Sequence, residues 1–85
     1  MRNVELILNG RRAVVSFLSR YRDKNDFEIY QGGKTGRVSK RDNGEVISQS
    51  ENFSQSDAAI AILAYEVADA KALIEWRKNL ARLEG

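Results

Sequence analysis

Residues 54–83 form a run without glycine or proline that consists largely of strong helix formers. Ser54 precedes Asp57 by three residues, the spacing at which a hydroxyl and an acid cap the first turn of a helix. Gly85 stands where helices commonly end. The run therefore predicts one helix over about residues 54–83, which would be roughly 45 Å long at 1.5 Å per residue.

Two apolar stripes follow this predicted helix at spacings of three and four residues. The first is expected to face a sheet and comprises Ile60, Leu63, Val67, Ala70 and Ile74. The second is rotated from the first and comprises Leu73, Trp76, Leu80 and Leu83. Strands of about six residues span only roughly 20 Å, so the end of the helix would overhang.

An overhanging apolar stripe needs a partner, and a symmetric second copy would supply one. We therefore expect a homodimer whose interface comprises Leu73, Trp76, Leu80 and Leu83. The alternative is a helix that breaks near residues 68–69 and folds back, with Trp76 as a lid on the core of its own chain.

The region before the helix has the pattern of an antiparallel meander. Strands are expected at about residues 4–8, 12–18, 27–31, 37–41 and 45–50. Asn9-Gly10, the glycines of residues 32–36 and Asp42-Asn43-Gly44 supply turns, and residues 20–26 are expected to form a polar connection. A short helix over residues 11–22 is the rival for the second strand. The chain thus predicts a single α+β domain over residues 1–85, an antiparallel meander of four to five short strands packed on one long C-terminal helix.

Composition restricts the chemistry. The chain has no cysteine and no histidine, which excludes disulfides, thiolate and imidazole catalysis and nearly all zinc and iron sites. We expect no cofactor, no metal and no small-molecule substrate, because an enzyme would need a site of Asp, Glu, Lys, Tyr and Ser alone. Neither a signal peptide nor a membrane-length apolar run is recognised, so a cytoplasmic protein without membrane contact is expected.

Charge is unevenly distributed along the chain. Residues 1–41 hold ten Lys or Arg and four acids, whereas residues 42–85 hold four and eight. The predicted basic surface, suited to an acidic protein or to nucleic acid, comprises Arg11, Arg12, Arg20, Arg22, Lys34, Arg37, Lys40 and Arg41. Tyr21 and Tyr30 could stack bases beside it. Gly33-Lys34-Thr35 resembles the tail of a phosphate-binding loop, but Glu28 stands where that loop needs its first glycine.

Several short motifs carry a resemblance. Phe27-Glu28-Ile29-Tyr30, Asn43-Gly44-Glu45-Val46-Ile47 and Ser50-Glu51-Asn52-Phe53-Ser54, followed by an alanine-bearing helix, resemble the YegP-like family of small bacterial proteins. The resemblance covers about residues 27–67 and implies three antiparallel strands crossed by one helix. Residues 37–41 lack the aromatic residues of that family's second strand, and Asn52 replaces a glycine. The family has no established activity.

These observations favour a small non-enzymatic protein-interaction module that acts as a homodimer and binds a protein partner. Phage and mobile-element inhibitors of host defence complexes such as CRISPR-Cas have this size and style, which makes such an inhibitor a specific version of the hypothesis. A nucleic-acid-binding module that uses the basic hairpin face is the alternative.

Overall fold

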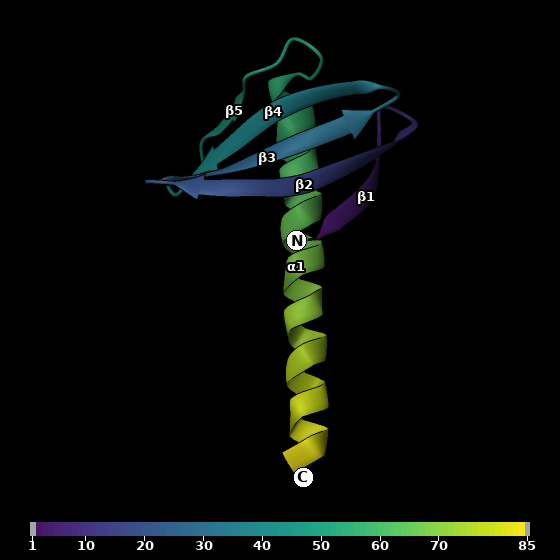
Figure 1. The fold of residues 1–85 in the computed structure, drawn as a ribbon, viewed down its shortest axis with the longest axis vertical. Coiled ribbons are helices and arrows are strands. Elements are labelled where there is room, and N and C mark those ends of the chain that lie inside the picture. Colours follow the sequence, from purple (N-terminus) through teal and green to yellow (C-terminus); the bar gives the residue numbers. More distant parts are fainter. Residues whose placement is uncertain (1, 85) are drawn as a thin grey trace.

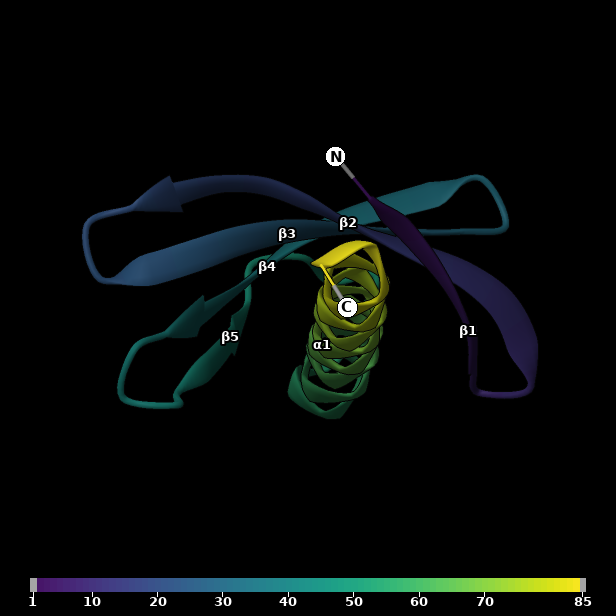
Figure 2. The ribbon, with the colours of Figure 1, turned by 90° about the horizontal axis from the view of Figure 1, so that it is seen from below.

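The computed structural model describes residues 2–84, and it contains a five-stranded antiparallel sheet crossed by one helix (Figure 1). The strands are β1 (Asn3–Leu8), β2 (Arg11–Tyr21), β3 (Lys24–Gln31), β4 (Lys34–Arg41) and β5 (Val46–Ser48), and they lie in the sheet in sequence order. Helix α1 (Gln55–Glu84) crosses the concave face of the sheet (Figure 2). The predicted α+β meander with a long C-terminal helix is confirmed.

Three of the four hairpins have two-residue turns, and the sequence predicted the one at Asn9-Gly10. Asn9 and Gly10 have φ angles of 54° and 78°, and Gly32 and Gly33 have 57° and 82°, as such turns require. Residues 22–23 join β2 to β3, with Arg22 at φ 54°. The prediction of a polar connection over residues 20–26 was therefore wrong, because most of these polar residues pair across β2 and β3.

The rival helix over residues 11–22 is also wrong, since β2 occupies residues 11–21 of this segment. Two neighbours fix it as a strand. Residues 11–16 pair with β1 and residues 14–21 pair with β3, apart from a register shift between Phe17 and Ser19. Pairing on both sides satisfies backbone groups that an isolated helix would satisfy internally, so the sheet overrides the helical spacing of its apolar residues.

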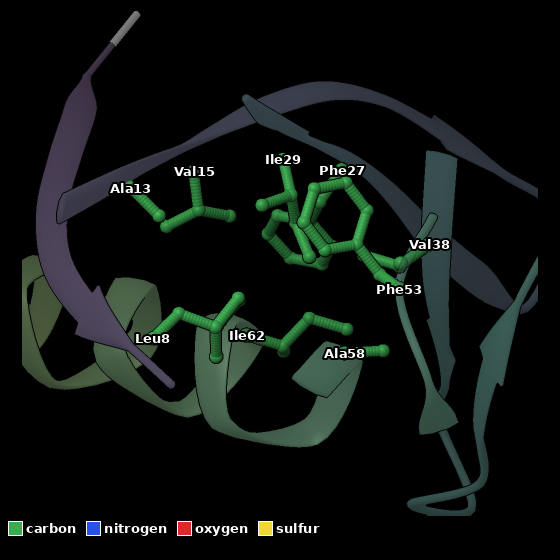
Figure 3. Packing of buried hydrophobic residues seen from close by; sticks show 10 residues of the cluster. Leu8, Ala13, Val15, Phe27, Ile29, Val38, Phe53, Ala58 and Ile62 are labelled. Carbon is green, nitrogen blue, oxygen red and sulfur yellow. The ribbon is translucent and has the colours of Figure 1, made fainter. Parts of the chain in front are cut away.

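The core lies between the concave face of the sheet and the first half of α1 (Figure 3). Ten residues that are at most 4% exposed form it: Leu8, Ala13, Val15, Phe27, Ile29, Val38, Phe53, Ala58, Ala61 and Ile62. The strands and the loop before α1 supply the large side chains, whereas α1 contributes two alanines and one isoleucine. The small helix residues let the backbone of α1 approach the sheet closely.

The first apolar stripe of the helix was assigned to the core, and this prediction was wrong. Ile60, Leu63, Val67 and Ile74 are between 45% and 60% exposed, and Ala70 is exposed as well. The face that meets the sheet comprises Ala58, Ala61, Ile62 and Tyr65. Both faces of α1 carry apolar residues, so the spacing of apolar residues alone did not identify the face that meets the sheet.

Ser54 and Asp57 cap α1 reciprocally. The backbone N–H of Asp57 donates to Ser54 Oγ at 3.0 Å, and the backbone N–H of Ser54 donates to Asp57 Oδ2 at 3.1 Å. Asn9 Nδ2 also donates to Asp57 Oδ1, at 3.1 Å. The Ser54 backbone N–H, followed by the side chains of Asn9 and Ser54, holds the pKa of Asp57 below its ordinary value. The predicted helix start is confirmed.

Replacement of Asp57 by alanine is expected to lower the free energy of unfolding by about 1 kcal/mol near neutral pH, as for other helix caps. Because the folded-state pKa of Asp57 is depressed, its contribution is complete above the unfolded pKa of about 3.9 and is lost as the pH falls through the folded value. Urea unfolding from pH 6 to pH 2 should show the difference between wild type and Asp57→Ala shrinking below about pH 4. A difference that is constant with pH would contradict this assignment.

Gly36 lies in β4 opposite Ile29, although the sequence placed it in a turn. A methyl group added to it would lie 2.6 Å from Cδ2 of Phe53 and 2.8 Å from Cβ of Ser50. Gly36→Ala is therefore expected to destabilise the fold by about 1–3 kcal/mol through overpacking. Gly44→Ala tests a different role of glycine, its freedom to adopt a positive φ, since Gly44 has open space around it but a φ of 94°. Equal stability of Gly36→Ala and wild type in urea would show that Phe53 does not press on this strand.

Candidate interaction surface

The C-terminal half of α1 projects beyond the sheet (Figure 1). Thirty residues give a helix of about 45 Å, whereas five strands at about 4.8 Å spacing form a layer of roughly 20 Å. The longest dimension of the molecule, 51 Å, follows from this projection. The predicted overhang is confirmed, and the alternative of a helix that breaks near residues 68–69 is wrong.

Large apolar side chains lie exposed on the overhang. Leu73, Trp76, Leu80 and Leu83 are 49%, 59%, 39% and 85% exposed. At 100° per residue these four side chains continue the face on which Ala58, Ala61, Ile62 and Tyr65 meet the sheet. The overhang thus extends the core-facing stripe of α1 past the last strand that could cover it. Trp76 is not a lid on the core, because its own chain leaves it open.

A groove of about 540 Å³ leads from the sheet onto this stripe. Phe17 and Phe27 line it from β2 and β3, Tyr65 and Leu73 line it from α1, and Glu66 and Asp69 lie at its side. The three aromatic rings form one cluster, with Phe27 centred 5.3 Å from Tyr65 and 5.7 Å from Phe17. Sequence reasoning did not single out these rings, because only the crossing of the helix over the hairpin brings them together.

The predicted basic residues do not form one patch. The strand register places Arg11, Arg12, Lys34 and Arg37 toward one end of the sheet, and Arg20, Arg22, Lys40 and Arg41 toward the other. A surface that combines all eight is therefore not present.

Half of these basic side chains are engaged in ion pairs. Arg12 pairs with Glu5, Arg20 with Asp42, Lys40 with Glu66 and Arg41 with Glu45. Arg20 binds Asp42 through two nitrogens, at 2.7 and 3.0 Å, and this hydrogen bonding holds the pKa of Asp42 below its ordinary value. Arg12 donates to Glu5 through one nitrogen, and this hydrogen bond raises the pKa of Arg12. Each pair neutralises a cation that phosphate binding would need.

Of the remaining four cations, Arg22 lies at one end of the sheet, and Arg11, Lys34 and Arg37 lie toward the other. Arg22 packs its guanidinium over the ring of Tyr21, 5.3 Å from the centroid. Arg11, Lys34 and Arg37 have no carboxylate partner within residues 2–84. Lys34 begins β4, so Gly33-Lys34-Thr35 belongs to a hairpin tip and its following strand.

The helical carboxylates have structural partners. Glu66 accepts two hydrogen bonds from Lys40 Nζ, at 2.9 and 3.1 Å, and Asp69 lies 3.8 Å from Arg2. In the part of the chain that the structure describes, no three acidic side chains gather in a way that could hold a metal ion. Within residues 2–84, no helix combines the length and apolar character that crossing a bilayer requires.

Comparison with known proteins gives no relative for this chain: no family model, curated protein or solved structure matches it. The three strands and the helix that the YegP-like motifs imply are present in the structure, as β3, β4, β5 and α1. Membership of that family remains a prediction.

Proposed function

We propose that this chain is a non-enzymatic protein-interaction module that acts as a homodimer, paired through the overhang of α1. The observation that carries the proposal is the exposed stripe of Leu73, Trp76, Leu80 and Leu83, in phase with the core-facing side of the helix. Leaving such a stripe in water forfeits the hydrophobic free energy that its burial would supply. Trp and Leu at helical spacing are typical of helix–helix interfaces.

An antiparallel pair of overhangs accounts for the residues on this surface. With Trp76 near the two-fold axis, Leu73 of one copy would face Leu80 of the other, and Leu83 would approach the aromatic groove of its partner. Apolar complementarity between the stripe and the aromatic groove therefore favours this orientation.

Trp76 supplies a direct test, because it is the only tryptophan of the chain. Sedimentation equilibrium over a range of concentrations should give twice the monomer mass of 9.6 kDa. The tryptophan emission should shift to shorter wavelength over the same range, since the indole leaves water when the dimer forms. A mass of 9.6 kDa at every concentration would contradict the proposal.

The nucleic-acid alternative has less support than it had from the sequence alone. Four of the eight cations are neutralised in ion pairs, and the eight are divided between two ends of the sheet. A steep fall of nucleic-acid affinity with added salt would restore it.

A further inference from the structure

Strand β1 forms a free edge of the sheet beside α1 (Figure 2). All six of its residues pair with β2 without a bulge. In an antiparallel pair, every second residue directs its N–H and C=O away from the neighbouring strand. Within residues 2–84, the only β1 backbone group that a side chain reaches is the carbonyl of Leu8, which accepts from Gln31 Nε2 at 2.8 Å. A row of unpaired backbone groups therefore follows the outer side of β1.

The opposite edge of the sheet is better protected. β5 has only three residues, and Ser48 Oγ at its end donates to the carbonyl of Phe53 at 2.6 Å. Proteins usually protect edge strands by shortness, proline, bulges or charges that point inward. β1 is six residues long without proline or bulge, its inward side chains are the apolar Val4, Leu6 and Leu8, and its one charged residue, Glu5, is paired with Arg12.

A groove of about 460 Å³ lies between β1 and α1. Val4 lines it from the strand, and Ile60, Leu63 and Val67 line it from the exposed stripe of the helix, with Lys71 at one end. Two hydrogen bonds tie the ends of β1 to the helix. Arg2 Nη1 donates to the carbonyl of Ala68 at 2.9 Å, and Asn9 Nδ2 donates to Asp57. The free edge and the apolar groove are therefore held side by side.

We propose that this edge and groove bind an extended segment of a partner protein as a sixth strand. The segment would pair with the outer backbone groups of β1 and place alternate side chains on the groove. Unpaired strand groups are matched by another extended backbone, which a helix cannot supply because its backbone groups bond internally. The added strand would continue the curl of the sheet around α1 and cover the stripe that the fold leaves exposed.

Charge around the groove indicates an acidic segment. Glu5 is paired with Arg12 and Asp69 lies beside Arg2, whereas Lys71 has no carboxylate partner within residues 2–84. A second copy is a poorer occupant, because its β1 carries only one acidic residue, Glu5, which is already paired with Arg12. The expected segment alternates apolar residues with polar ones that include Asp or Glu.

The test uses the acetylated and amidated octapeptide Thr-Val-Asp-Val-Glu-Ile-Thr-Val, titrated into the full-length ¹⁵N-labelled protein. We expect saturable amide shifts confined to residues 3–8 and 60–71, with a Kd on the order of 1 mM or tighter. Two further versions of the peptide are N-methylated at the odd or at the even residues, so that each version lacks the N–H donors along one of the peptide's two edges. One of them should bind at least about tenfold more weakly than the parent peptide.

Leu63→Glu should weaken binding of the parent peptide at least about tenfold, because it places a charge on the apolar groove. Ala59→Glu is the matched control, since Ala59 is exposed on the same half of α1 but does not line the groove. It should bind the peptide within about twofold of wild type. A peptide in which lysines replace the two acids should bind more weakly than the parent.

Three results would overturn the inference: no shift at any peptide concentration, shifts outside β1 and the groove, or equal binding by Leu63→Glu and wild type. If the protein is a dimer and Leu63→Glu makes it monomeric, the β1 edge would be the site where a second copy binds, and the inference would also be overturned. The inference rests on the proposed function only in treating the chain as a protein-binding module. A variant made monomeric by Trp76→Glu and Leu80→Glu should still bind the peptide. Peptide binding therefore tests the inference about β1, and the mass in solution tests the proposed dimer independently.

Discussion

Replacement of Trp76 and Leu80 together by glutamate is expected to convert the proposed dimer into a folded monomer. Both side chains are exposed in the single chain, at 59% and 39%, so the substitutions leave the intramolecular core intact. In the dimer they would place two carboxylates in a desolvated helix interface, where loss of one central aromatic residue alone commonly costs about 2 kcal/mol or more. The dissociation constant should therefore rise at least about 100-fold.

Sedimentation equilibrium measures the change in association, and far-ultraviolet circular dichroism with urea unfolding shows that the monomer remains folded. The control is the pair Lys78→Gln and Ala81→Glu, which changes the net charge by the same amount on the opposite face of the overhang. It should leave the dissociation constant within about threefold of wild type. Equal weakening by both pairs would mean that charge alone, and not the stripe, governs association.

The sequence was sufficient for the fold class because its strongest signals are local. A run of thirty residues without glycine or proline, with Ser54 and Asp57 at its start, requires little beyond helix propensity and capping. Asn9-Gly10 and Gly32-Gly33 likewise bring their own positive φ angles to two-residue turns. Each of these elements is decided by residues adjacent in the chain.

The turn at Arg22 shows where local signals fail. Arginine rarely takes a positive φ, so nothing at residues 22–23 indicated a tight turn. Pairing of Tyr21 with Lys24 and of Arg20 with Asn25 stabilises the hairpin through contacts along both strands. Because the register of β2 and β3 was unknown, the separation of the basic residues into two ends of the sheet could not be foreseen either.

The candidate site was predictable only in part. Leu73, Trp76, Leu80 and Leu83 were found because the spacing of apolar residues within a helix is visible in the sequence. The aromatic groove and the free edge of β1 depend on which strands neighbour one another and on where the helix crosses them. Those relations arise from tertiary packing, as does the rotation of α1 about its own axis.

The rotation of α1 can be tested with two isoleucines two residues apart. Ile62 is 1% exposed and packs in the core, whereas Ile60 is 51% exposed on the far side of the helix. Ile62→Ala should therefore lower the free energy of unfolding by about 3 kcal/mol through lost burial and a cavity. Ile60→Ala should lower it by less than about 1 kcal/mol, since the side chain already contacts water and alanine is the better helix former.

Urea unfolding of both variants, measured under the same conditions as wild type, gives this comparison directly. Helix propensity favours alanine equally at the two positions, so the difference between the variants reports burial alone. Because the free energy of unfolding of a domain of 85 residues is only several kcal/mol, a loss of about 3 kcal/mol is easy to detect. If Ile60→Ala were the more damaging change, the stripe of Ile60, Leu63, Val67 and Ile74 would face the sheet. The groove beside β1 would then be closed, and the overhanging stripe would no longer continue the core.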